Sequence, residues 1–245
     1  MIEGVPLILA LDTATSCSSV ALTRGSAGSV NGGQGGQVLA SLSLNSSVTH
    51  SRRLLSAIDW LLAEAEIDWP TVDGLAVSIG PGSFTGLRIG MATVKGLATA
   101  IGKPLLGVST LDGLAFNCTG EHLICAVLDA RKKEVYACFY RADGQGIPRR
   151  VGAIRVLSPQ KLAAEIDQPV LFVGDAVMAY GDFWQEALGP WFVSAPMTLH
   201  YPCASGLGLL AGEMLQQNQC LELATATPLY VRASDAELSL GAVAK

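Results

Sequence analysis

The sequence carries little charge for its length. Of its 245 residues, 15% are charged and 50% are hydrophobic, whereas about a quarter of the residues in a soluble domain are usually charged. The formal net charge is −5, so the chain lacks the basic surplus with which a protein binds nucleic acid by itself. No apolar run approaches the ~18 residues that a membrane helix needs. The hydrophobic surplus must therefore be buried in protein, which predicts an oligomer or a permanent partner and no membrane.

The common sequence patterns of metal sites and disulfides are also missing. The six cysteines form no Cys-x-x-Cys pair, and the three histidines, at positions 50, 122 and 200, form no His-x-x-x-His pair. Because a zinc site needs three or more convergent ligands, we predict no metal site and reduced, mostly buried thiols. The apolar run 5–11 is too short for a signal peptide and has no basic residues before it. These features predict a cytoplasmic protein.

The most informative stretch is residues 78–90, which reads SIGPGSFTGLRIG. The apolar run that leads into it predicts a buried strand over 74–79. Gly80 and Gly82, on either side of a proline, predict a turn directly after that strand.

A helix is predicted to follow this turn, over residues 85–101. Ser83 or Thr85 can cap it, and Arg88 falls in its first turn. Free N–H groups at such a helix start suit an anion; alternatively, the glycines let the helix lie close against a sheet. The Gly-Lys-Ser/Thr ending of a P-loop is missing, and connectors of this kind are common, which favours the close approach.

The whole stretch resembles the signature of the bacterial TsaB (YeaZ) family, the partner protein in threonylcarbamoyladenosine synthesis on tRNA. Further segments agree with the family in order and spacing: residues 9–15, 50–55, 95–98, 107–111, 128–131, 134–136 and 228–232. The resemblance covers nearly the whole chain and is densest up to about residue 140.

The resemblance implies an α/β fold of two ribonuclease-H-like domains, of the actin/Hsp70/sugar-kinase type, facing a cleft. The sequence pattern agrees, because strands and helices that suit one such domain appear twice. Predicted strands cover 6–12, 18–23, 38–44, 74–79, 105–108, 123–129, 134–140, 154–157, 170–173 and 191–193. Predicted helices cover 51–65, 85–101, 158–166, 182–187 and 205–216. We therefore predict a first domain over 1–108, a second over 109–204, and a C-terminal helix and tail over 205–245 that return to the first, with mixed five-stranded sheets.

In that superfamily, two hairpins that begin with Asp and continue with glycines hold the nucleotide phosphates. Asp12 and Thr13 stand at the first hairpin here, and Asp129 and Arg131 stand at the second. Neither hairpin has the glycine that lets backbone approach a phosphate, so we interpret both as degenerate. Asp12 can instead end its strand and bind its own turn, and the basic tip 131–133 can meet an anion or remain solvated.

Two predicted helices offer a surface for a partner. The first, 51–65, has an apolar stripe that we expect to be buried, formed by Leu54, Leu55, Ile58, Leu61, Leu62 and Ala65. Trp60 points away from that stripe, and tryptophan is typical of an interface anchor. The second, 85–101, is apolar on a second, small-residue side that permits close helix packing. The predicted partner surface comprises Arg53, Ser56, Trp60, Ile89, Met91, Thr93, Gly96 and Ala100.

Two functions of different classes follow. The family resemblance implies a non-catalytic scaffold that binds and activates a TsaD-like catalytic subunit, for modification of the adenosine beside the anticodon in ANN-decoding tRNAs. A TsaE-like ATPase is the second partner, ATP and metal are expected on those partners, no intrinsic cofactor is expected, and tRNA is contacted only indirectly. Alone, the protein is expected to form a homodimer through the helices of its first domain. The alternative is an autonomous kinase-like or metallopeptidase-like enzyme of the same fold, against which the lone His50 and the missing glycines argue.

Overall fold

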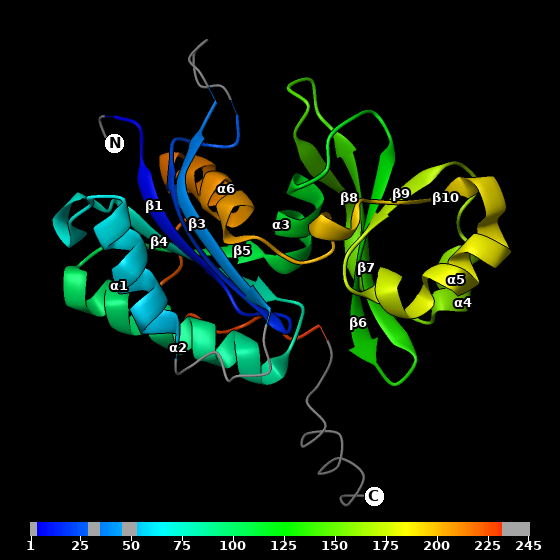
Figure 1. Ribbon diagram of the computed structural model, residues 1–245, viewed down its shortest axis with the longest axis horizontal. Coiled ribbons are helices and arrows are strands. Elements are labelled where there is room, and N and C mark those ends of the chain that lie inside the picture. Colours follow the sequence, from blue (N-terminus) through cyan, green and yellow to red (C-terminus); the bar gives the residue numbers. More distant parts are fainter. Residues whose placement is uncertain (1–3, 29–34, 46–52, 232–245) are drawn as a thin grey trace, which may run out of the picture.

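The computed structural model describes residues 4–28, 35–45 and 53–231. Two lobes stand side by side, each built on one five-stranded sheet, as Figure 1 shows. His50 and Arg232, which belong to segments that resemble the family, lie outside the described residues. So do positions 29–34 of the glycine-rich loop, which covers residues 25–37 between two predicted strands.

The first sheet has the strand order β3-β2-β1-β4-β5. Strands β1, β2 and β3 pair antiparallel, whereas β4 and β5 run parallel to β1. Every residue of β1 is buried, because helices cover both faces of the sheet (Figure 1). The strands are β1 (Leu7–Asp12), β2 (Cys17–Arg24), β3 (Gln37–Asn45), β4 (Gly74–Gly80) and β5 (Leu105–Ser109).

Helices α1 (Leu54–Glu64) and α2 (Phe84–Ile101) cover one face of this sheet. Helix α6 (Ala204–Gln216) covers the other face, where it packs against β1 and β2. Helix α6, which follows the second sheet in the sequence, thus lies on the first sheet. The stem of the glycine-rich loop also rests on α6, since Ala27 N donates to Leu209 O at 2.9 Å.

The second sheet has the order β10-β9-β6-β7-β8. If the strands are numbered from β6 and the sheet is read from β8, this is the same order as in the first sheet. The pattern that the sequence repeats is therefore a repeat of topology. Its strands are β6 (Leu123–Arg131), β7 (Glu134–Ala142), β8 (Pro148–Leu157), β9 (Val170–Val173) and β10 (Phe192–Ser194). Helices α4 (Pro159–Ala163) and α5 (Ala176–Leu188) pack on one face around Trp184. Helix α3 (Thr110–Phe116) packs on the other face, between the two sheets (Figure 1). Short 3₁₀ turns occur at Trp69–Thr71, Gly189–Trp191 and Met197–Leu199.

Element bounds differ from prediction where the pattern is interrupted. Strand β8 begins at Pro148 rather than at 154, and a bulge in its pairing with β7 breaks the alternation that would have revealed it. Helix α5 begins at Ala176 rather than at 182. Gly181 stands in its middle, and glycine weakens a helical pattern in the sequence.

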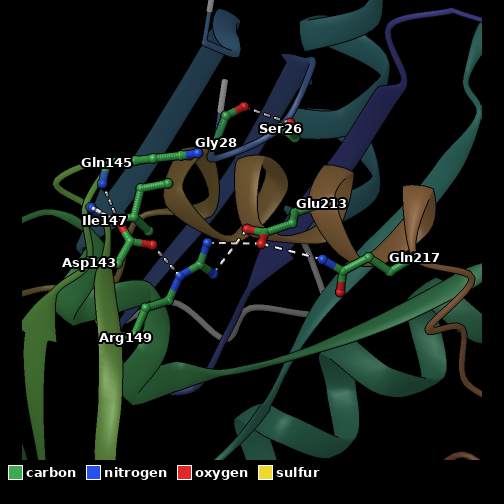
Figure 2. Close-up of polar contacts among 8 residues, drawn as sticks. All are labelled: Ser26, Gly28, Asp143, Gln145, Ile147, Arg149, Glu213 and Gln217. Atoms are coloured by element: carbon green, nitrogen blue, oxygen red, sulfur yellow. Dashed lines mark hydrogen bonds and ion pairs between the residues drawn. The ribbon is translucent and has the colours of Figure 1, made fainter. Parts of the chain in front are cut away.

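The two lobes are joined by ion pairs at one end of β7. The Arg149 guanidinium binds both oxygens of Glu213 on α6, at 3.0 and 2.8 Å, and its Nε donates to Asp143 at 2.9 Å (Figure 2). Nearby, Arg150 binds both carboxylate oxygens of Asp112 on α3, each at 2.7 Å. These contacts hold the second sheet to the helices between the lobes.

Candidate functional site

A cavity of about 500 Å³ lies between the lobes, at the other end of β7 from these ion pairs. Residues from both hairpins, from the turn 80–83 that we call the glycine loop, and from the end of the described chain meet there. The lining residues are Ala14, Thr15, Ser16, Pro81, Gly82, Ser83, Phe84, Leu87, Leu128, Asp129, Ala130, Arg131, Lys132, Tyr136, Asp175, Leu229, Tyr230 and Val231. The volume falls in the range of small-molecule sites.

Asp12 and Thr13, the candidate phosphate residues of the first hairpin, are absent from this lining and wholly buried. Asp12 Oδ1 accepts a hydrogen bond from Ala14 N at 3.0 Å, whereas Oδ2 has no partner among the described residues. Burial raises the pKa of Asp12 to about 6, and the bond from the Ala14 amide opposes that rise. Thr13 Oγ1 donates to Gly86 O at 2.7 Å, so its hydroxyl is engaged within the lobe.

The glycine loop covers this first hairpin. Ser83 N donates to Ala14 O at 2.6 Å, and the Ser83 hydroxyl caps α2 by accepting from Gly86 N at 3.3 Å, as predicted. A Cβ added at Gly82 would collide with Ala14 O, and one at Gly86 would collide with Thr13 O. The glycines thus let α2 lie directly on the hairpin, which agrees with the close-approach interpretation.

The end of the described chain meets β4 and the start of α2. Leu229 N donates to Ile79 O at 2.7 Å, and Arg88 Nε donates to Tyr230 OH at 3.0 Å. The Arg88 guanidinium also lies 3.9 Å from the centre of the Phe84 ring. Thr85 is exposed. Sequence reasoning missed the roles of Phe84 and Tyr230, because they meet only through a contact between distant parts of the chain.

The second hairpin keeps its charged groups bound to one another. Asp129 Oδ1 accepts from Arg131 N at 2.9 Å, and its Oδ2 lies 3.1 Å from Arg131 Nη1. Asp129 N donates to Asp175 Oδ1 at 2.9 Å, and burial raises the pKa of Asp175. Residues 131–133 all have positive φ, between 52° and 61°, which is uncommon for residues with side chains. Asp175 was not identified from the sequence, since only the fold brings the start of α5 beside this hairpin.

No group of three potential His, Cys, Asp or Glu metal ligands occurs within residues 4–28, 35–45 and 53–231. His200 is buried and accepts from Gly174 N through Nδ1 at 3.2 Å, and burial lowers its pKa. The six cysteines are free; four are buried, whereas Cys203 is half-buried and Cys220 exposed. Over the same described ranges, no helix combines the length and apolarity required to cross a bilayer.

The predicted partner surface is largely open but needs two corrections. Trp60 is 53% exposed, as expected, but Leu55 is 54% exposed although we placed it on the buried stripe. In the structure, Ala57 and Leu62 are the two edges of the buried stripe. At ~100° per residue around the helix, Leu55 lies just outside the edge formed by Leu62. Met91 is 4% exposed within the first core, so it contributes little area to such a surface.

Of the other residues placed on that surface, Ile89 and Thr93 are half-buried, and Thr93 Oγ1 donates to Ile89 O at 2.9 Å. The exposed members are Arg53, Ser56, Gly96 and Ala100.

The two lobes have the same strand order and face a cleft, and helix α6 returns from the second lobe to the first sheet. This arrangement defines an α/β protein of the actin/Hsp70/sugar-kinase class. Residues 39–240 match the family model TsaD, described as tRNA N6-adenosine threonylcarbamoyltransferase. The tRNA threonylcarbamoyladenosine biosynthesis protein TsaB of Escherichia coli (strain K12) is 31% identical over 231 residues, 92% of this chain and 94% of that protein. The protein of the same name in Haemophilus influenzae is 32% identical, over 92% of this chain and 93% of its own length.

A solved structure, YeaZ from Pseudomonas aeruginosa, superposes with a TM-score of 0.74 at 32% identity and covers 92% of this chain and 99% of its own. The chain belongs to the TsaB (YeaZ) family, whose named members are proteins of tRNA threonylcarbamoyladenosine biosynthesis. The resemblance found in residues 78–90 is thereby confirmed.

Proposed function

We propose that this protein is a non-catalytic subunit of a tRNA threonylcarbamoyl-transferase assembly, which binds and activates a TsaD-like catalytic subunit. The observation that carries the proposal is the burial of Asp12 and Thr13 beneath the glycine loop and α2. A phosphate-binding hairpin must present its backbone and carboxylate to the cleft. Here the Asp12 carboxylate is buried, and the N–H and C=O groups of Ala14 are hydrogen-bonded to Asp12 and Ser83. ATP and metal then belong to the TsaD-like and TsaE-like partners, and tRNA is held through them.

The partner surface we propose is the outer side of α1 and α2. Trp60 and Leu55 expose large apolar side chains on α1, and the exposed Gly96 and Ala100 on α2 leave room for another helix to approach. A paralogous subunit with equivalent helices can meet this surface in a pseudo-twofold arrangement. In its absence, the same helices pair two copies of this chain.

Replacing the central anchor tests this surface. Trp60→Asp should weaken binding to the TsaD-like subunit of the same organism by ~2 kcal/mol or more, about 30-fold in Kd. Isothermal titration measures this loss. Trp191→Asp is the matched control, since Trp191 is 41% exposed on the second lobe and should leave the affinity unchanged. Unchanged binding by Trp60→Asp would place the interface elsewhere. A large fall in its melting temperature would instead show that Trp60 supports the fold.

A thermal melt with ATP and Mg²⁺ separates the scaffold from a kinase-like enzyme. Because Asp12 does not reach the cleft, we expect millimolar nucleotide to leave the melting temperature unchanged. A rise of several degrees that is lost in Asp12→Ala would show a working nucleotide site and contradict the proposed division of labour.

A further inference from the structure

The ends of the two sheets differ in how their outer strands are protected. At β5, Leu221 N donates to Leu105 O at 2.8 Å, so the returning chain covers the edge. Strand β10 has only three residues. Strand β8 carries three arginines and a bulge in its pairing with β7, both of which discourage pairing with another chain.

Strand β3 is neither covered by another segment of the described chain, nor short, nor charged. It is nine residues long, reads QVLASLSLN without a charged residue or proline, and pairs only with β2 in the described part of the chain. The one irregularity in that pairing lies between Leu22 and Thr23, opposite the start of β3. Residues 40–45 therefore form a regular edge whose outer row of backbone donors and acceptors is paired by no other described strand, and such an edge can template a further strand.

The side chains of this regular part alternate. Ala40 and Leu42 pack against the first core, on the side of α1, and Leu44 shares their side of the strand. Ser41 and Ser43 are exposed on the side of α6, where Ser43 Oγ lies 3.0 Å from Ser19 Oγ. The alternation is symmetric about Leu42.

We propose that β3 is an interaction surface for β3 of a second copy of this chain, paired antiparallel and centred on Leu42. This register sets Leu42 opposite Leu42, Ala40 opposite Leu44 and Ser41 opposite Ser43, so each apolar residue meets an apolar one. No like charges meet, and a one-residue slip would set apolar residues against serines. The two first sheets then join into one continuous sheet through backbone hydrogen bonds. A foreign strand could satisfy the same backbone groups, but the self-complementary alternation favours a second copy.

This contact is independent of the α1 and α2 surface proposed above, so the test uses Trp60→Asp protein, in which association through those helices is blocked. We expect sedimentation at micromolar concentration to show a dimer of this variant. Adding Ser41→Lys with Ser43→Lys sets lysines opposite one another and should give a monomer, as should Ser41→Glu with Ser43→Glu. An equimolar mixture of the two charge variants should restore the dimer. Lysines at Ala179 and Ala187, which are exposed on α5, are the matched control and should leave it intact.

A monomeric Trp60→Asp protein would overturn the proposal. A dimer that both charge variants retain would overturn it as well, and so would a mixture that remained monomeric although each component is folded. Should either charge variant fail to fold, hydrogen exchange on Trp60→Asp decides the matter. The amides of residues 40–45 should gain protection as the protein concentration rises, and protection that did not depend on concentration would refute pairing at β3.

Discussion

Helix α2 packs closely on the first hairpin. Replacing two of its glycines with alanine should therefore change the free energy of unfolding in opposite directions. A Cβ at Gly86 would collide with the carbonyl oxygen of Thr13, whereas a Cβ at Gly96 would meet nothing within 4 Å. Gly86→Ala should therefore destabilise the protein, and Gly96→Ala should stabilise it.

The magnitudes follow from the contacts. Overpacking costs ~1–3 kcal/mol, with the higher values expected where backbone rather than a flexible side chain must move. Displacing α2 also weakens the bond from Thr13 Oγ1 to Gly86 O, which contributes about 1 kcal/mol. Alanine returns at most ~1 kcal/mol of helix propensity at either site. The net expectation is a loss of about 2 kcal/mol for Gly86→Ala and a gain of ~0.5–1 kcal/mol for Gly96→Ala.

Urea unfolding followed by circular dichroism measures both free energies of unfolding under one set of conditions. For a chain of this size, the loss at Gly86 corresponds to a fall in melting temperature of about 4–8 °C. Gly86→Ala protein as stable as the wild type would refute the packing of α2 on the hairpin. A destabilised Gly96→Ala would mean that position 96 is already covered, for instance by a second copy.

Two further predictions concern buried charge and the link between the lobes. Burial raises the pKa of Asp12 from its ordinary value of 3.8 to about 6 in the folded protein. The folded state therefore holds this proton more tightly than the unfolded state does, and the protein loses stability as pH rises from about 4 to 6. The loss approaches 3 kcal/mol. Asp12→Asn should then be the more stable protein at neutral pH, with a margin that vanishes near about pH 4; a constant margin in melts across this range would contradict the buried ionisation. Arg149→Ala removes the contacts to Glu213 and Asp143 and should speed hydrogen exchange where α6 faces β8. Arg155→Ala, which breaks a pair within the second lobe, should not, and equal effects would contradict a linking role for Arg149.

Most of the secondary structure could be predicted because it rests on local periodicity. The apolar run that becomes β1 and the glycine turn that follows β4 are contiguous signals, and Ser83 caps α2 as its position indicated. The first part of helix α5 escaped prediction because Gly181 stands in the middle of the helix and weakens its apolar pattern.

The candidate site could be predicted only in its parts. The missing glycines of both hairpins could be read from the sequence, and the structure places Asp129 and Arg131 on the cleft. That Asp12 and Thr13 lie beneath α2 depends on contacts across some seventy positions of chain, which no local pattern encodes. The same holds for Tyr230 on Arg88 and for Asp175 on Asp129.

The sequence by itself therefore determined the class of fold, the family and the absence of glycines from both hairpins, since each of these is written in neighbouring residues. Only the tertiary structure decided which side chains reach the cleft and which helical residues stay exposed. Trp60 was placed correctly from its helical phase, but Leu55 and Leu62 differ by only ~20° in phase, and one is exposed while the other is buried. Burial at such a boundary depends on where a neighbouring element ends, and that position is set by packing between segments far apart in the chain.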